Sequence, residues 1–302
     1  MTKSTVACAA IVMSFVSTSF TGAQENSAPV LTGPYLGQKP PGKVPEIFAP
    51  GVISTDTAHE FAITIAPDGK EIFFTRRVEG DIGNRIYHMK CEDGVWSDPV
   101  LCPFSSGNVE LEPNFTPDGK TIFFNSWRAL PESAATGNDM NVWLARQEGG
   151  LWGIIGVLGP PVSDLYPVYV TQTRDSTIYF TGNVNRGVYR AECQGGEYRR
   201  WERLPDEINN RNWAGHPYID PDERFVLFDS NVDTLGTKNL FISFKLGSHT
   251  WSPSVSINEH LGFAAHAAMP HVTFDGRFLF FSSQGDIYWV CASFLEDLRP
   301  SQ

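Results

Sequence analysis

A few histidines and carboxylates are the residues of this sequence best suited to chemistry. His59 and His266 each follow an alanine at corresponding places in two similar segments, and His216 lies in a third segment of the same kind. Imidazole is a common ligand of first-row metals, and Glu60 or Glu112 could serve as a fourth ligand or as a base. These residues predict a site for a divalent metal ion held by His59, His216 and His266, although the sequence establishes no cofactor with certainty.

Other residues near these histidines allow different chemistry. Glu112 and Asp229 could form the acid and base pair of a glycosidase, for which the separation of the two carboxyl groups decides the outcome. Trp127 and Arg128 open a long loop that ends near Asn141, where a ring could stack on a sugar and a guanidinium could hold a carboxylate. Alternatively, all these side chains could simply hydrogen-bond loop backbone and water.

Several signatures of other enzyme classes are absent from the sequence. It contains no GxSxG, no HExxH, no phosphate-binding glycine loop and no dinucleotide fingerprint. Their absence argues against serine hydrolases, zincins and nucleotide-dependent enzymes. It does not exclude an enzyme whose site is assembled from distant segments.

The composition indicates a folded protein that does not bind nucleic acid. The chain has 302 residues, 41% of them apolar, and a formal net charge of −11. Such a length can bury a full core in one large domain or two small ones. Because phosphate binding relies on clustered Lys and Arg, and the basic pairs here are scattered, neither nucleic acid nor an anionic membrane is expected as a partner.

The N-terminus has the layout of a secretory signal. Lys3 supplies a positive charge, residues 6–20 form an apolar run, and Thr21-Gly22-Ala23 has the small residues of a cleavage site. The run is too short to span a membrane, and no second stretch could do so. We therefore expect a signal peptide over residues 1–23 and a mature protein that is periplasmic or secreted, with no membrane span.

Four cysteines follow the predicted signal peptide. An even number in an exported chain allows three disulfide connectivities. However, the sequence has no CxxC and no zinc-ligand spacing. Buried free thiols are the preferred interpretation of Cys91, Cys102, Cys193 and Cys291.

One sequence motif recurs along the chain. APDGKEIFFT at 66–75 returns as TPDGKTIFFN at 116–125, and related versions start at residues 173, 220 and 273. The steps between their second aromatic residues are 50, 56, 48 and 53 residues, and these aromatics are Phe74, Phe124, Phe180, Phe228 and Phe281. A period of this length indicates a repeat architecture.

The first four repeats each carry four strand signals. An alternating segment precedes a Pro-Asp-Gly turn or its variant, an aromatic β-rich segment follows, and a third alternating segment comes next; in four repeats a Trp introduces the fourth. The last repeat lacks a fourth segment, whereas residues 44–54 resemble one and precede the first repeat. An N-terminal strand completing the last blade would close the ring and remove exposed edges.

The sequence therefore predicts an all-β fold. We expect a five-bladed β-propeller of four-stranded antiparallel blades over residues 44–302, with its last blade closed by an N-terminal strand. Residues 24–43 are expected to form an N-terminal linker.

The repeat also carries a family resemblance. A Pro, then Ser/Thr-Pro-Asp-Gly-Lys and Ile-Phe/Tyr-Phe, resembles the TolB-type, WD-repeat-like (PD-repeat) propellers of exported bacterial proteins. This resemblance covers most of the chain and implies a fold more than a function, because the family includes binding proteins, peptidase-associated propellers and a few carbohydrate-degrading enzymes. Oligogalacturonate lyases carry related repeats and hold a divalent metal through several His at one mouth, although their motifs are not reproduced here residue for residue.

The propeller fold converts sequence position into position in space. First strands line the central channel, and their starts lie at the same mouth as the ends of the second strands, whereas the Pro-Asp-Gly turns lie at the other mouth. The candidate ligand-binding residues all fall at the first mouth: His59, Glu60, Arg76, Glu112, Trp127, Arg128, His216, Asp229, Asn231 and His266.

Two functions are compatible with this arrangement. The first is an exported binding or interaction module that takes a glycan or a protein ligand at this mouth. The alternative is a carbohydrate-active enzyme, for which a metal-assisted polysaccharide lyase is favoured over a glycosidase. Whether the protein is an enzyme stays open.

Overall fold

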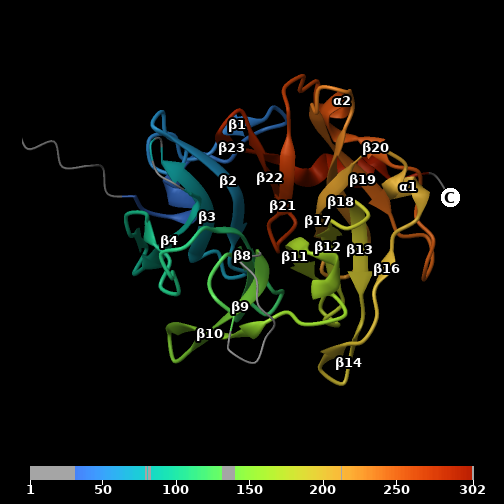
Figure 1. Ribbon diagram of the computed structural model, residues 1–302. Helices are drawn as coiled ribbons and strands as arrows, with labels where there is room; N and C mark the ends of the chain where they lie inside the picture. Colours follow the sequence, from blue (N-terminus) through green and yellow to red (C-terminus); the bar gives the residue numbers. More distant parts are fainter. Residues whose placement is uncertain (1–30, 79, 81–82, 131–139, 212, 301–302) are drawn as a thin grey trace, which may run out of the picture. The chain divides into compact units, whose positions relative to one another are not determined.

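Five antiparallel sheets make up the described part of the chain. A computed structural model describes residues 31–78, 80, 83–130, 140–211 and 213–300, so the predicted signal peptide lies outside the described residues. Figure 1 shows the sheets arranged around a common axis, each with its first strand innermost. The predicted five-bladed propeller is confirmed.

The first four blades follow one another in chain order. Blade 1 consists of β2 (Ala58–Ile65), β3 (Glu71–Val78), β4 (Arg85–Glu92) and β6 (Val100–Leu101), with β5 (Val95–Trp96) as a short extension. Blade 2 consists of β7 (Glu110–Phe115), β8 (Thr121–Ser126), β9 (Asn141–Glu148) and β10 (Leu151–Val157). Blade 3 consists of β11 (Pro167–Gln172), β12 (Ile178–Gly182), β13 (Gly187–Ala191) and β16 (Glu202–Arg203), beside a separate hairpin of β14 (Cys193–Gln194) and β15 (Glu197–Tyr198). Blade 4 consists of β17 (Ala214–Ile219), β18 (Phe225–Asn231), β19 (Lys238–Phe244) and β20 (Val255–Ser256).

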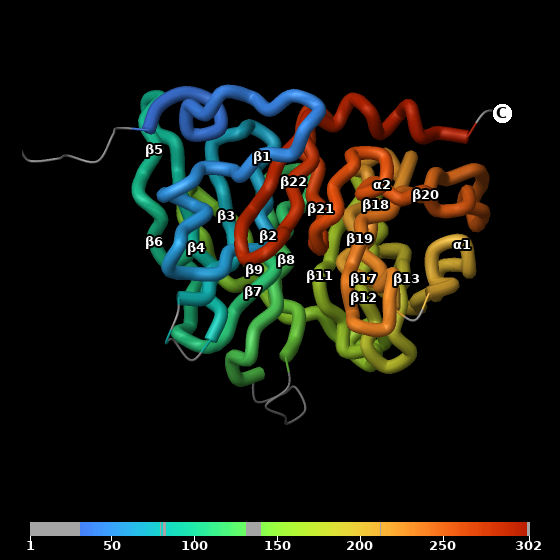
Figure 2. The backbone as a smooth tube through the Cα atoms, turned by 90° about the horizontal axis from the view of Figure 1, so that it is seen from above, coloured from blue at the N-terminus to red at the C-terminus, as the bar shows by residue number. Residues whose placement is uncertain are grey.

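The last blade joins the two ends of the described chain. It consists of β21 (Ala268–Val272), β22 (Phe278–Ser283), β23 (Asp286–Cys291) and, as its outer strand, β1 (Glu46–Ile47). Glu46 lies opposite Trp289 in antiparallel register. Figure 2 shows the blue segment that carries β1 beside the red strands of this blade. The predicted closure by an N-terminal strand is confirmed.

Five short helices lie between the strands or at the two ends of the described chain. They are η1 (Pro34–Gly37), η2 (Ser163–Leu165), α1 (Asp206–Asn209), α2 (Ile257–Leu261) and η3 (Ala292–Leu298). The segment around η1 packs on the propeller, because Leu36 is buried and the Tyr35 ring lies 5.0 Å from that of Phe278.

The Pro-Asp-Gly part of the repeated motif folds as the predicted hairpin turn. In blade 2 the Asp118 carboxylate accepts hydrogen bonds from the Thr116 hydroxyl and the Lys120 N–H, and Gly119 takes a φ of +68°. This positive φ is open to glycine at no steric cost. Asp175 and Asp275 hold the corresponding turns in the same way.

The outer strands of four blades are short. Those of blades 1, 3, 4 and 5 have two residues each, and only β10 of blade 2 has seven. The short strands lie beside Pro99, Pro205, Pro253 and Pro45. Proline has no N–H to donate to a sheet, so it ends the pairing after one or two residues.

Each innermost strand carries a bulge at the same place. Its register shifts there, and the residue at the shift has a positive φ; these residues are Ala62, Glu112, Tyr169, His216 and Met269. The N–H of each donates, over 2.7 to 3.2 Å, to a polar side chain of the preceding blade; the acceptors are Ser282, Thr75, Asn125, Thr181 and Asp229, in the same order. This hydrogen bond ties every blade to its neighbour around the ring.

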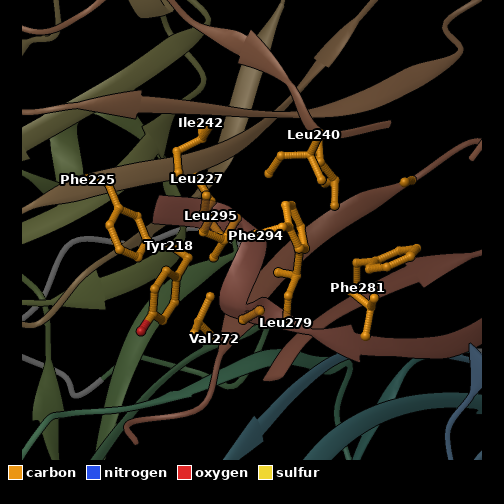
Figure 3. Packing of buried hydrophobic residues seen from close by; sticks show 14 of the residues in the cluster. Tyr218, Phe225, Leu227, Leu240, Ile242, Val272, Leu279, Phe281, Phe294 and Leu295 are labelled. Atoms are coloured by element: carbon orange, nitrogen blue, oxygen red, sulfur yellow. The ribbon is translucent and has the colours of Figure 1, made fainter. Parts of the chain in front are cut away.

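The core lies between the blades. Figure 3 shows one cluster in which Tyr218, Leu227 and Leu240 of blade 4 face Leu279 of blade 5 and Leu295 of η3. The four cysteines are free thiols as expected, but only Cys102 is fully buried.

We predict that the closing segment carries much of the stability. Phe48 is fully buried, with its ring 5.0 Å from Phe280 and 5.1 Å from Trp289. Phe48→Ala should lower the free energy of unfolding by about 3–5 kcal/mol, the usual cost of emptying a buried aromatic site. Urea unfolding measures this, and Val44→Ala, at an exposed position of the same segment, should change stability by less than about 0.5 kcal/mol. Equal effects of the two substitutions would contradict the role of this segment.

We also predict that the protein loses stability in mild acid. Burial lowers the pKa of His271 to about 3 and that of His88 to about 4. Both stay neutral in the folded protein while the unfolded chain takes up protons below about pH 6.5, so each histidine lowers the unfolding free energy by about 1.4 kcal/mol per pH unit from there down to its own folded pKa.

The variant His271→Leu isolates one of these contributions. Neither ring nitrogen of His271 has a hydrogen-bond partner among the described residues, so leucine removes the protonation without breaking a bond. Urea unfolding at several pH values should give a shallower acid slope for His271→Leu than for the wild type. Identical slopes would show that His271 is not held neutral.

Candidate functional site

Three ionisable side chains meet on the channel axis. His216, at the bulge of β17, places Nδ1 2.6 Å from Asp229 Oδ2 of β18 and Nε2 3.7 Å from Glu112 Oε1 of β7. Glu112 belongs to blade 2 and His216 to blade 4, so their contact crosses the channel. The imidazole therefore lies between the two carboxyl groups. We call Glu112, His216 and Asp229 the axial cluster.

Burial and neighbouring groups together shift the pKa values of the two carboxyl groups in opposite directions. Burial raises the pKa of Glu112 above its ordinary value, against the opposing effects of His216 and Lys238. Burial also acts to raise the pKa of Asp229, but His216, Lys238 and the hydrogen bond from the Met269 N–H together hold it below its ordinary value. Asp229 is therefore the ionised member of the pair, and Glu112 is the one that retains a proton more readily.

The ionised Asp229 also orients the histidine. An ionised carboxylate only accepts hydrogen bonds, so His216 Nδ1 carries the proton and donates it to Asp229. In the neutral ring this leaves Nε2, which faces Glu112, as an acceptor. Glu112 Oε2 is buried and has no hydrogen-bond partner among the described residues. The cluster can therefore hold a proton at Glu112 and accept one at His216.

Tyr169 closes the channel beside this cluster. It occupies the bulge of β11 in blade 3, is fully buried, and donates its hydroxyl to the Pro270 carbonyl of blade 5 over 2.8 Å. Its ring lies edge-on to His216 at 5.3 Å. Tyr169 and Pro270 belong to blades that are not adjacent, so this hydrogen bond crosses the channel and blocks it next to the cluster.

A cation and an aromatic ring stand next to the cluster. Lys238 Nζ lies 3.2 Å from Asp229 Oδ1 and 3.6 Å from the centre of the Trp213 ring, which in turn packs 5.1 Å from His216. The Lys238 backbone N–H donates to His266 Nδ1. Burial lowers the pKa of His266, and nearby Lys238 adds to this effect, which favours a neutral ring with its proton on Nε2.

A pocket of about 230 Å³ lies at the same mouth, between blades 1 and 5. It is lined by His59, Arg77, Asn84, His266 and Ser283, among others. His59 packs directly against Gly285, where a Cβ would lie 2.9 Å from the His59 ring. The structure thus brings His59 and His266 to one pocket, as their matching sequence positions predicted, and places His216 on the axis.

Three predicted site residues form ion pairs within the protein. Glu60 is fully buried, binds Arg76 at 2.8 Å and accepts hydrogen bonds from Thr55. In blade 2, Arg128 pairs in the same way with Glu110, which is fully buried and also accepts from the Ser105 and Ser106 hydroxyls. Each pair fastens the segment that enters a blade, so Glu60, Arg76 and Arg128 have their polar groups engaged.

The remaining candidates lie further from the axis. Trp127 is 53% exposed, and its backbone N–H donates a hydrogen bond to the Val109 carbonyl, directly before β7. Asn231 ends β18 opposite Lys238, as expected from its place in the repeat. Residues 131–139 of the long loop lie outside the described part of the chain.

Sequence reasoning missed Tyr169, Trp213 and Lys238. One signal for the cluster was present, because the residue after the aligned aromatic residue is polar in every repeat: Thr75, Asn125, Thr181, Asp229 and Ser282. Only Asp229 is charged, which distinguishes blade 4.

The predicted metal site is not marked by a grouping of ligands among the described residues. Across the ranges that the structure describes, no group of three or more His, Cys, Asp or Glu side chains is placed to hold a metal ion. The prediction of a divalent ion at His59, His216 and His266 gains no support from this geometry and stays a prediction.

Comparison with known proteins identifies the fold. No protein-family model and no curated protein matches the sequence. A putative glycoside hydrolase from Bacteroides ovatus is 10% identical, with a TM-score of 0.51 over 91% of this chain and 99% of that one. TolB from Acinetobacter baumannii is 11% identical, with a TM-score of 0.46 over 78% of this chain and 55% of that one.

The low sequence identities limit these comparisons to the fold. A putative TolB from Agrobacterium tumefaciens, 17% identical, also matches, with a TM-score of 0.46 over 75% of this chain and 70% of that one. This chain spans 55% of the length of the Acinetobacter protein. At such identities a comparison shows the fold alone, and the TolB-type, PD-repeat assignment stays a prediction. Among the described residues, no helix is long and apolar enough to cross a membrane.

We predict that Glu112 lowers the stability of the protein in neutral and alkaline solution. Because burial raises its folded pKa, its contribution to stability is fully present below its ordinary pKa and is lost as the pH rises through the raised value. At about pH 8, Glu112→Gln should raise the free energy of unfolding by about 1–3 kcal/mol, the cost of an uncompensated buried polar group. The gain should shrink toward about pH 4.

Urea unfolding of Glu112→Gln and of the exposed control Glu148→Gln tests this. The control should follow the wild type at every pH. A Glu112→Gln variant that is less stable than the wild type across the whole range would mean that the Glu112 charge is well compensated.

Proposed function

We propose that the protein is a binding propeller that takes a glycan at the channel mouth. The observation that carries this proposal is the buried Glu112 carboxyl on the axis, whose Oε2 accepts no hydrogen bond from the described residues. Buried polar atoms are almost always paired. A hydroxyl group that enters the mouth would supply the missing donor.

The shape of the mouth favours a small ligand over a folded protein. Tyr169 closes the axis, and the adjoining pocket of about 230 Å³ is smaller than the usual cavity for a drug-sized ligand. Hydroxyl groups could bond to Glu112 and to the Asn84 Oδ1 and Ser283 Oγ atoms, which are also buried without partners among the described residues.

Aromatic side chains at the rim suit the faces of sugar rings. Trp127, directly after β8 of blade 2, and Tyr166, directly before β11 of blade 3, are both about half exposed, at 53% and 52%. An aromatic face packs against the C–H face of a sugar, while the polar edges of the sugar bind to charged and amide groups. Arg77 in the pocket would allow such a glycan to carry a carboxylate.

A second candidate function is a carbohydrate-active enzyme, and the axial cluster favours it. Asp229 holds His216 with Nε2 directed toward Glu112, and burial favours the protonated form of Glu112. A histidine held by a carboxylate is the usual arrangement of a general base, and a buried carboxylic acid suits a general acid. The imidazole occupies the space between Glu112 and Asp229, so these two carboxyl groups would not flank a sugar as a glycosidase pair.

We also propose that the protein is exported. The predicted signal peptide lies outside the described residues, and a periplasmic or secreted location rests on the sequence and on the resemblance to TolB-like propellers. Such a location would bring the protein into contact with extracellular glycans.

We predict that Glu112→Gln weakens glycan binding without unfolding the protein. A panel of neutral and acidic polysaccharides should raise the melting temperature of the wild type. Calorimetry with the best ligand should show about tenfold weaker binding to Glu112→Gln, because the amide replaces one acceptor oxygen of the carboxyl group by an NH2 donor. Glu71→Gln is the matched control, because burial also raises the pKa of Glu71, which lies at the start of β3 near the opposite mouth.

The same samples distinguish the two functions. New reducing or unsaturated ends released from the ligand by the wild type, but not by His216→Asn, would identify the enzyme. Binding without such products supports the binding module. If no glycan shifts the melting temperature, or if Glu112→Gln binds as tightly as the wild type, the glycan proposal is wrong.

A further inference from the structure

The outer strand of blade 2 differs from every other outer strand. β10 has seven residues, whereas β6, β16, β20 and β1 have two each. It ends its sheet, in the order β10-β9-β8-β7, so one of its edges has no strand beside it among the described residues. A long free edge offers a row of unpaired N–H and C=O groups to another strand.

β10 also lacks the features that usually protect such an edge. The outer segments of the other blades all contain proline, and three of them contain charged residues. Leu151–Val157 reads LWGIIGV, with no proline and no charge. Short strands, proline and charge are the common means of preventing edge-to-edge pairing, and β10 has none of them.

The surface of β10 is apolar and uncovered. Leu151 is 78% exposed, Ile154 39% and Ile155 48%. A Cβ built on Gly153 or Gly156 would meet no other atom within 4 Å. Trp152 and Val157 of this strand pack partly against the core, whereas Leu151, Ile154 and Ile155 lie largely uncovered by the described chain.

We propose that β10 pairs with β10 of a second copy of this chain, in an antiparallel manner across a two-fold axis. This surface is independent of the channel mouth, and the inference does not rest on the proposed function. The regular part of the strand is Leu151–Ile154, because the register with β9 shifts between Ile154 and Gly156. Antiparallel pairing of this part sets Leu151 of one copy opposite Ile154 of the other.

The self-complementarity of the uncharged strand selects a second copy as the partner. The chain carries a net charge of −11, so most contacts between two copies would bring like charges together. β10 is an uncharged strand, and its pairing with itself places apolar residues opposite apolar residues. A two-fold contact of one patch with itself is the commonest way in which identical chains associate and it closes at the dimer.

The test is the oligomeric state of the purified full-length protein. Sedimentation velocity over roughly a hundredfold range of concentration should show a reversible monomer–dimer equilibrium. Ile154→Lys should raise the dimer dissociation constant by about tenfold or more, because it places a charge in each half of the paired edge. Leu101→Lys, at an equally exposed apolar position on the short β6 of blade 1, should leave the constant unchanged.

Melting temperatures of the two variants show that each is folded. A protein that is monomeric over the whole range overturns the proposal, as does a dimer that Ile154→Lys leaves intact. Open-ended oligomers would also contradict it, because two-fold pairing stops at two copies. A monomer that instead binds an extended apolar peptide along β10 would assign this edge to a different partner.

Discussion

The hydrogen bond from the bulge N–H of each inner strand to the preceding blade is the interaction on which the rest of this structure depends. Each bulge places a non-glycine residue at a positive φ, which is unfavourable unless the surroundings fix it. The acceptor side chain supplies that constraint and links neighbouring blades at the same time. In the last step of the ring, Ser282 of blade 5 accepts from Ala62 of blade 1, so this bond also closes the circle.

The axial cluster is a variation on this structural bond. Four blades use a neutral acceptor, whereas blade 4 uses Asp229, which binds the Met269 N–H and also His216. Glu112 and His216 themselves occupy bulge positions, and so the backbone feature that joins the blades also brings their side chains together across the channel. The stability cost of burying Glu112 is the kind of cost that functional sites commonly carry.

At the rim of the propeller, the length of the outer strands is the feature that varies between blades. Proline and charge limit the outer strands of four blades to two residues, and the N-terminal strand β1 covers the last blade. Blade 2 lacks this protection along β10. The centre of the molecule therefore gathers buried polar side chains, while one sector of the rim leaves a long strand edge without a neighbouring strand among the described residues.

The sequence by itself determined the fold, the number of blades, the hairpin turns and the closure by residues 44–54. Local patterns carry these features: turn residues at fixed places, strand alternation and a repeat period. It also determined which residues share a mouth, because that follows from their place in the repeat. Only the tertiary structure decided which of these residues meet. Glu112 and His216 lie in blades that are not adjacent, and their contact depends on the bulges and on the width of the channel, which no local pattern records. In the same way, the structure showed that Glu60, Arg76 and Arg128 form buried ion pairs, because a charged residue at a mouth can face either the channel or the entering loop, and only packing decides between them.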